Sequence, residues 1–470
     1  MAENILKTTL VALLLIIGSV ETLPAGGADV VISGRKVSIQ ATEVPLQDLL
    51  RAVSRYGIRV RIDPDINPPV TASFSDRDLG AGLKAILKPT NHIFVWETPG
   101  DTFDSPPVLT EIQVFHPGKK ERMQPLEPHA VFAVARRGET GPYFILGEVL
   151  VRVASRAALE TLAEAVERAG GTITPAGNLP MIYRIRFPED YDVFSLAEQL
   201  KRFPGVDTAE PHYAYPIVSP ARVGKVGPAS PVLPDRPQDA PGAPVAILDT
   251  GVEMIAGLSD RVKTTLNALD PDAAPSDTQG HGTQMALVAA GLVTPTGKAS
   301  SDLGSPDVLP IKVFDGNGFT SGLTVFNSVA FALENGARVL SLSWGSETGS
   351  EIMESIFRAA SGKGLLIVAA AGNEPTGRPF FPAAYDAVIG VGALNPDGTR
   401  WVNSNHGEFV SFYAPGFATL PIGYGGDPGG YAGTSIATAY TANLVAGYLD
   451  QNPQAGLVEV KDYLRAVLGP

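Results

Sequence analysis

The second half of the chain, from about Pro241 to Pro470, alternates short apolar runs with segments of helical spacing. The candidate buried strands are 245–248, 308–314, 338–343, 365–370 and 387–391. Helices are expected over about 282–291, 321–335, 351–361 and 436–449. This alternation is typical of an α/β fold with a mostly parallel sheet flanked by helices. Functional groups on such a sheet lie beyond the carboxyl ends of the strands.

Length and composition limit the classes of protein to consider. A chain of 470 residues exceeds one ordinary hydrophobic core, so roughly two to four domains are expected. The net charge of −13 argues against a nucleic-acid partner, which would need clustered Lys and Arg. The absence of cysteine from the sequence excludes disulfides, thiolate zinc sites and a lipid-bearing cysteine.

Three side chains of complementary chemistry lie in short motifs: Asp249 in Asp-Thr-Gly, His281 in Gly-His-Gly-Thr and Ser435 in Gly-Thr-Ser. A serine hydroxyl is a poor nucleophile until a neighbouring base accepts its proton. His281 is the candidate base, and Asp249 is the candidate group that holds the imidazole in the required tautomer. Singly, the aspartate is also typical of a turn and the histidine of a helix start. Their conjunction favours a serine-protease site.

Two further segments fit the same chemistry. Asn373, in Ala-Gly-Asn-Glu, is the candidate donor to the oxyanion of an acyl-transfer intermediate, together with the backbone N–H of Ser435. A simple turn residue is the alternative for an asparagine after glycine. Ser343, Trp344 and Gly345 follow a predicted strand and offer an edge to which an extended polypeptide substrate can pair.

More motifs follow in register with these: Ala370-Ala-Gly-Asn-Glu374, Phe381-Pro382, Ser404-Asn405 and Ala414-Pro-Gly416. Together they resemble the subtilases, and the chain order Asp, His, Ser is that of subtilisin. The resemblance implies a serine endopeptidase with polypeptide substrates, whose chemistry requires no cofactor or metal ion. A structural calcium ion is compatible with it, but no ligand set can be assigned.

The resemblance has departures around the predicted site. Gln284, Ile436 and Ala439 stand where the family usually has histidine, methionine and proline. A backbone N–H restored at position 439 could shift Ser435 slightly, and small shifts are costly in catalysis. Phe380 and Phe381 precede the proline whose neighbours floor the family's specificity pocket. They either narrow that pocket or pack in the core.

The N-terminal half divides into several segments. Residues 1–28 carry Lys7 and an apolar run over 10–20, which predicts a signal peptide, with an uncleaved anchor as the alternative. Export to the periplasm, the cell envelope or the medium is expected. Residues 99–128 and 217–240 are rich in proline and are predicted linkers, the second holding the maturation cut.

Two small α+β domains are expected upstream of the sheet. Residues 29–98 resemble the short N-terminal domain of secretins and TonB-dependent receptors, through Val37–Ala41, Pro45–Leu50, Tyr56-Gly57 and Asp63–Asp65. That resemblance implies docking to an envelope or secretion protein, and a spacer without a partner is the alternative. Residues 129–216, ending in Ala209-Glu-Pro211, resemble the subtilase propeptide, which implies an intramolecular inhibitor.

The sequence therefore predicts an exported serine endopeptidase, made as a self-inhibited precursor, with residues 241–470 as its catalytic domain. Two alternatives are weighed against it. One is a non-catalytic envelope scaffold with a degenerate protease domain. The other is an enzyme that passes the acyl group to an amine and so ligates or processes peptides.

Overall fold

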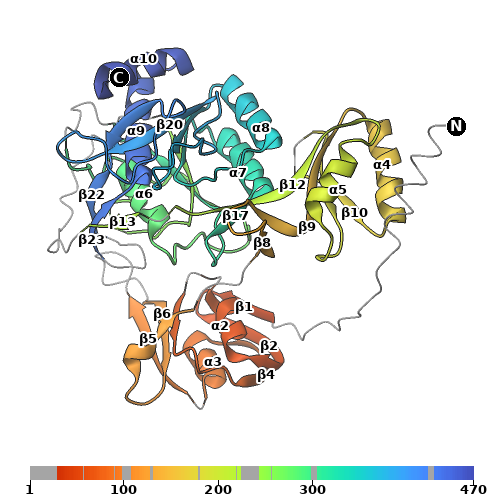
Figure 1. The fold of residues 1–470 in the computed structure, drawn as a ribbon. Helices are drawn as coiled ribbons and strands as arrows, with labels where there is room; N and C mark the ends of the chain where they lie inside the picture. Colours follow the sequence, from red (N-terminus) through yellow and green to blue (C-terminus); the bar gives the residue numbers. More distant parts are fainter. Residues whose placement is uncertain are drawn as a thin grey trace.

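The computed structural model describes residues 29–469, apart from 55, 57, 89, 98–106, 127–130, 178–179, 219, 224–242, 256, 298–303 and 422–427. The predicted signal peptide, 1–28, lies outside the described residues. Figure 1 shows three folded units, here called the N-terminal unit (29–126), the middle unit (131–216) and the C-terminal unit (243–469). In the described part of the chain, no helix is long and apolar enough to cross a membrane.

The N-terminal unit has two sheets around two short helices. Its elements are β1 (Asp29–Ser33), β2 (Lys36–Pro45), α2 (Leu46–Ser54), β3 (Arg59–Ile62), β4 (Pro69–Asp78), α3 (Leu79–Ile86), β5 (Asn91–Glu97), β6 (Val108–Phe115) and β7 (Gln124–Pro125). The sheet orders are β1-β2-β4 and β5-β6-β3-β7. Leu46, Leu49, Leu50 and Val53 are buried on one side of α2, as their spacing predicts.

The linker predicted over 99–128 is wrong for its second part. Strand β6 lies between β5 and β3 and belongs to the N-terminal unit. Leu109, Ile112 and Val114 are buried in the core of that unit, whose last core residue is Leu126. Prolines precede and follow β6 in the sequence without interrupting it, so proline content alone was misleading.

The middle unit is an antiparallel sheet with two helices packed on it. Its elements are β8 (Val134–Arg136), β9 (Tyr143–Val153), α4 (Arg156–Arg168), β10 (Thr172–Pro175), β11 (Ile182–Arg186), α5 (Val193–Leu200) and β12 (Val206–Pro216). Ser155 and Asp192 cap the two helices, each through its side-chain oxygen. The helices bury Leu162, Val166 and Leu196 against the sheet.

The C-terminal unit is built on a seven-stranded parallel sheet of order β15-β16-β14-β18-β19-β20-β21. Its strands are β14 (Val245–Asp249), β15 (Leu266–Asn267), β16 (Val308–Lys312), β18 (Val339–Leu342), β19 (Leu366–Ala370), β20 (Val388–Leu394) and β21 (Phe412–Pro415). Its helices are α6 (His281–Ala289), α7 (Gly322–Glu334), α8 (Glu351–Gly362), α9 (Thr434–Gln451) and α10 (Leu457–Leu468). The predicted α/β class is confirmed, because α6, α9 and α10 pack on one face and α7 and α8 on the other.

The segment predicted as a linker over 217–240 begins inside the fold. Ala221–Arg222 forms β13, which pairs with β23 (Gly429–Ala432), and β23 pairs with β22 (Phe417–Leu420). Residues 224–240 lie outside the described part of the chain. The chain therefore stays in contact with the C-terminal unit for several residues beyond β12.

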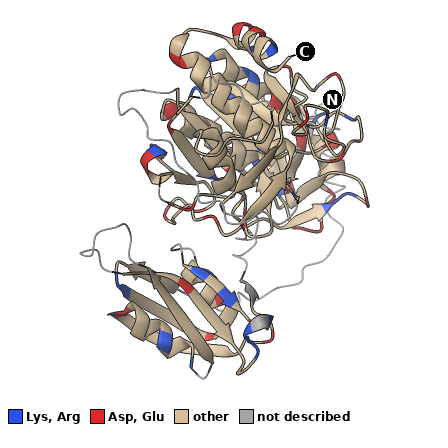
Figure 2. Cartoon of the chain, turned by 90° about the vertical axis from the view of Figure 1, so that its left-hand side faces the viewer, with Lys and Arg blue, Asp and Glu red and all other residues tan. Residues whose placement is uncertain are grey.

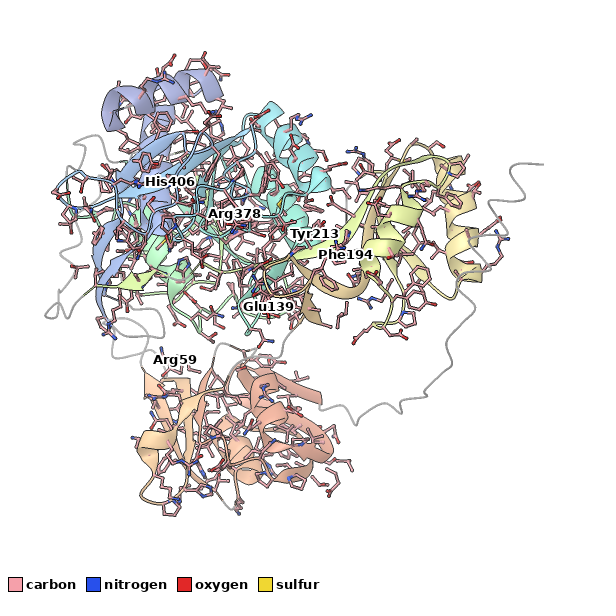
Figure 3. All side chains as sticks on the ribbon, in the orientation of Figure 1. Arg59, Glu139, Phe194, Tyr213, Arg378 and His406 are labelled. Atoms are coloured by element: carbon pink, nitrogen blue, oxygen red, sulfur yellow. The ribbon has the colours of Figure 1, made fainter. Side chains whose placement is uncertain are left out.

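Strand β12 joins the middle unit to the C-terminal unit. It pairs with β9 on one side and with β17 (Phe319–Ser321) on the other, with Ala214 opposite Ser321. The two strands lie side by side where the two units meet, next to Tyr213 and Phe194 (Figures 1 and 3). One antiparallel sheet thus continues from one unit into the other.

Two side chains of β12 also reach the starts of α8 and α7. The carboxylate of Glu210 accepts hydrogen bonds from the Ser350 hydroxyl and from the Glu351 N–H, the latter at 3.0 Å. Nε2 of His212 accepts from the Leu323 N–H at 3.2 Å, and its Nδ1 lies 2.7 Å from Glu148. Side chains of the middle unit therefore accept hydrogen bonds from backbone N–H groups in the first turns of α7 and α8, which have no partner within their own helices.

The contact at Glu210 makes the precursor sensitive to pH. Burial raises the pKa of this carboxyl group to about 7, although hydrogen bonds from Ser350 and Glu351 act in the opposite direction. Such a carboxyl group contributes its full stabilisation at pH values below the pKa that it has in the unfolded chain. The contribution decreases as the pH rises above that value and is lost as the pH rises through about 7, the pKa in the folded chain.

We expect the Ser435→Ala precursor, chosen to exclude self-cleavage, to lose about 3 kcal/mol of unfolding free energy between pH 5 and pH 8 through Glu210. A Glu210→Gln variant in the same background should lack this loss, because its amide does not titrate. Urea unfolding of both chains at the two pH values measures the difference. Identical pH dependence in the two chains would contradict the assignment.

Candidate active site

The predicted site residues meet beyond the carboxyl ends of three neighbouring strands. Asp249 is the last residue of β14, Ser343 follows β18, and Asn373 follows β19 shortly after its end. The strand order turns at β14, because β16 lies on one side of it and β18 on the other. Open parallel sheets bind their ligands at such a switch point.

Asp249 and His281 form a buried pair. Nδ1 of His281 lies 2.7 Å from Oδ1 of Asp249, which also accepts from the Thr250 N–H at 2.8 Å. His281 is fully buried and Asp249 is 1% exposed. A carboxylate at Nδ1 fixes the proton there and leaves Nε2 as the acceptor. The pair therefore has the arrangement required of a general base and its orienting carboxylate.

Asp277, which the sequence analysis did not select, holds the histidine-bearing turn. One oxygen of its carboxylate accepts from Thr250 Oγ1 and from the Gly280 N–H, each at 2.7 Å. The other accepts from the N–H and the hydroxyl of Thr283, at 2.8 and 2.7 Å. Thr250 in turn accepts from the Gly282 N–H at 2.8 Å. Asp277 thus ties the first turn of α6 to the end of β14.

Ser435 lies in the first turn of α9, as predicted, with Gly433 as the N-cap residue. Its hydroxyl donates to the Ser343 carbonyl at 3.4 Å, and the Ser343 hydroxyl donates to the Ser435 carbonyl at the same distance. Within the described residues, Nε2 of His281 has no hydrogen-bond partner. The serine and histidine are therefore not bonded to each other in this conformation.

Asn373 is oriented by a residue that the sequence analysis also missed. Its Oδ1 accepts from both the N–H and the hydroxyl of Thr434, each at 2.9 Å. Its Nδ2 lies on the side of Gly433, 3.4 Å from the position that a Cβ would take there. Because the amide oxygen is held by Thr434, the amide N–H groups point toward the residues just before Ser435. This orientation is compatible with the predicted role of Asn373 as an oxyanion donor.

The segment Ser343-Trp344-Gly345 is already paired with a strand-like peptide. Ile217 forms an antiparallel bridge with Trp344, and its N–H donates to the Gly318 carbonyl at 2.9 Å. Trp344 is fully buried, and its indole N–H donates to the Leu248 carbonyl at 3.2 Å. The predicted substrate edge is therefore already paired with another segment of the same chain.

Three residues differ from those that subtilases usually have at these positions, and none of them interrupts a helix. Gln284, Ile436 and Ala439 are fully buried. Helix α9 runs from Thr434 to Gln451, so alanine at 439 leaves the helix intact. Ile436 and Ala439 belong to the core cluster on this face of the sheet.

The described residues contain no group of three or more His, Asp or Glu side chains arranged to hold a metal ion. Acidic and basic residues are interspersed along the chain (Figure 2). A structural calcium ion therefore stays a prediction without a ligand set.

Comparison with known proteins identifies the family. The model of the subtilase family matches residues 241–467, and that of the fervidolysin N-terminal prodomain matches residues 132–212. Thermitase from Thermoactinomyces vulgaris is 32% identical over 212 residues, which cover 44% of this chain and 75% of thermitase. The chain belongs to the subtilase family and is a serine endopeptidase with an N-terminal prodomain, as the sequence predicted.

Two further relatives cover more of the chain. A thermophilic serine proteinase from Bacillus sp. strain AK1 is 27% identical over 355 residues, 74% of this chain and 82% of that protein. The crystal structure of fervidolysin from Fervidobacterium pennivorans, described as a keratinolytic enzyme related to subtilisin, matches with a TM-score of 0.55. It is 22% identical, and the match covers 72% of this chain and 59% of fervidolysin. This similarity shows a shared fold.

The network around Asp277 predicts a loss of activity from a residue that makes no contact with substrate. We expect Asp277→Ala to lower kcat by about 100-fold, because the turn that carries His281 loses its anchor. It should also cost about 3 kcal/mol of stability, since buried donors lose their acceptor.

Asp397 supplies a matched control, because it accepts from the N–H and hydroxyl of Thr399 in an exposed turn, at 2.9 and 2.6 Å. Peptidase assays on Asp277→Ala and Asp397→Ala test the role. Equal rates for the two variants would refute it.

Proposed function

We propose that this chain is an exported serine endopeptidase that is made as a self-inhibited precursor and uses Ser435 as its nucleophile. The observation that carries the proposal is the buried contact of 2.7 Å between His281 Nδ1 and Asp249 at the end of β14, together with Ser435, at the start of a helix and hydrogen-bonded to Ser343 at the end of the neighbouring strand β18. An apolar run after Lys7 supports export, to the periplasm, the cell envelope or the medium.

In this mechanism His281 removes the proton of the Ser435 hydroxyl as its oxygen attacks the carbonyl carbon of a peptide bond. Asp249 stabilises the imidazolium that forms. The Asn373 amide and the Ser435 N–H donate to the oxyanion, beside the positive end of the α9 dipole. In subtilisin, loss of the oxyanion-hole asparagine costs roughly 10²–10³ in rate. His281 then protonates the leaving amine, and water hydrolyses the acyl-enzyme.

The mechanism requires one movement of the nucleophile. The Ser435 hydroxyl donates to Ser343 in the structure, so it has to turn toward Nε2 of His281 before proton transfer. Catalytic hydrogen bonds are often absent or long before a substrate is bound in a reactive geometry. The 0% exposure of Ser435 supports a precursor in which the site is covered.

The middle unit acts as the inhibitor in this proposal. Its strand β12 lies on the edge strand β17, and Ile217 pairs with Trp344, so the edge that would receive a substrate is occupied. An extended peptide bound by main-chain hydrogen bonds is a recognised mode of binding at a sheet edge. The occupied edge therefore excludes other polypeptides until this segment is cut and released.

The N-terminal unit has a separate role in the proposal. Its two sheets and two helices are compatible with the resemblance to secretin and TonB-receptor domains, which suggests docking to an envelope protein. Cross-linking of the exported protein in intact cells tests this role. Recovery of the protease with no envelope partner would favour the simple spacer.

A fluorophosphonate probe reacts with an activated serine and separates the proposed function from its alternatives. We expect the wild-type chain to cut itself and to be labelled afterwards, and Ser435→Ala to do neither. A wild type that is neither cut nor labelled, with or without calcium, would favour the non-catalytic scaffold. Products joined to an added amine-bearing peptide, in excess of hydrolysis, would favour the acyl-transferring enzyme.

A further inference from the structure

The motif Ser404-Asn405 lies buried beside the candidate active site, and neither residue takes part in the proposed chemistry. Ser404 is fully buried, and Asn405 is 1% exposed in the wall of the cleft that Asn373 also lines. The Ser404 hydroxyl accepts from the Ala393 N–H of β20 at 2.9 Å and donates to the Asn405 carbonyl at 3.1 Å. Ser404 therefore anchors Asn405 to a strand of the parallel sheet.

Asn405 in turn holds the loop that carries Asn373. Its backbone N–H donates to the Gly372 carbonyl at 3.0 Å, one residue before Asn373. Its side-chain Oδ1 accepts from the Gly377 N–H at 2.9 Å, and its Nδ2 donates to the Arg378 carbonyl at 3.1 Å. A single buried residue thus binds the backbone just before the candidate oxyanion donor and again a few residues after it.

The loop has little regular structure of its own. It runs over residues 371–380, after β19, without a helix or strand, and residues 374–379 are exposed. The Thr376 hydroxyl and the Arg378 guanidinium each contact Glu347, at 2.9 Å. These contacts lie at the surface, where ion pairs contribute little. The contacts with Asn405 therefore hold the loop from its buried side.

Asn373 is fixed at two points, and Asn405 supports one of them. Oδ1 of Asn373 accepts from the N–H and the hydroxyl of Thr434, each at 2.9 Å. At its backbone the chain turns through Gly372, whose φ of +99° favours glycine and whose carbonyl Asn405 binds. An oxyanion donor has to be in place before the charge develops, and a displacement of about 1 Å is costly.

The side-chain amide of Asn405 fits its surroundings in one orientation. Its Oδ1 faces two donors, the N–H groups of Gly377 and His406, each at 2.9 Å, and its Nδ2 faces the Arg378 carbonyl. Asn405→Asp keeps the acceptor oxygen and loses the donor, whereas Asn405→Ala loses both. The two substitutions therefore remove the support of the loop in steps.

We propose that Asn405 is a positioning residue for the oxyanion donor, which acts on the reaction by holding the loop that carries Asn373. This inference rests on the proposed function and adds a residue to its machinery. An oxyanion forms only as the reaction proceeds, so loss of its donor lowers kcat and leaves KM largely unchanged. Loss of Asn405 should follow the same pattern.

A double-mutant cycle with Asn373 separates positioning from a general structural role. Asn405→Ala should lower kcat for a quenched-fluorescent peptide roughly 10- to 100-fold with KM unchanged, a smaller loss than the roughly 10²–10³ expected of Asn373→Ala. In the Asn373→Ala background, Asn405→Ala should change kcat by less than about 2-fold, because the group through which it acts is absent. Asn405→Asp should lose less than Asn405→Ala. All chains are made in full length and assayed after self-cleavage.

Asn395 provides a matched control. Its amide also donates to a nearby turn, to Thr399 Oγ1 at 3.0 Å and to the Arg400 carbonyl at 3.3 Å, but in an exposed position. Asn395→Ala should leave kcat and KM unchanged in both backgrounds.

The outcomes distinguish the inference from the function on which it rests. A loss of kcat with Asn405→Ala that disappears in the Asn373→Ala background supports the inference. An equal fold-loss in both backgrounds, or a wild-type kcat for Asn405→Ala, overturns it. A wild-type chain that fluorophosphonate does not label overturns the proposed function and the inference with it. Should Asn405→Ala fail to fold, the same cycle with Asn405→Asp decides.

Discussion

Strand β12 is the element on which the arrangement of the precursor depends. It is hydrogen-bonded to β9 of the middle unit and to β17 of the C-terminal unit, so both units share one sheet. Its side chains Glu210 and His212 accept from the starts of α8 and α7. Beyond its end, Ile217 and Val218 enter the cleft. The same strand thus docks the middle unit and leads into the residues that pair with the predicted substrate edge at Trp344.

The site itself depends on buried polar contacts that are satisfied from neighbouring elements. Asp249 and His281 come from β14 and α6, and Asp277 and Thr250 join these two elements. Thr434, next to Ser435, turns the Asn373 amide. Buried polar groups are costly unless they are hydrogen-bonded, and a complete network holds its members in one geometry. The candidate base and the Asn373 amide are therefore held in place, whereas the Ser435 hydroxyl still has to turn from Ser343 toward His281.

Much of this could be predicted because local patterns determine it. Asp249 follows a buried apolar run, His281 starts a helix after glycine, and Ser435 starts another, so three motifs located the site. The roles of Asp277 and Thr434 could not be predicted. Asp277 bonds Thr250 and Thr434 bonds Asn373, and both contacts join residues that are distant in the sequence and belong to no recognisable motif. Strand β6 was assigned to a linker because prolines lie before and after it in the sequence. That Phe381 packs against the core depends on a bridge to Ser346, a residue distant in the sequence.

Hydrogen exchange at β17 tests most directly that β12 covers the edge of the active site. The amides of Phe319–Ser321 should be protected in the Ser435→Ala precursor, where β12 pairs with them, and should exchange much faster in the wild-type enzyme after self-cleavage and removal of the middle unit. Equal exchange at β17 in the two samples, with the C-terminal unit folded in both, would contradict the account.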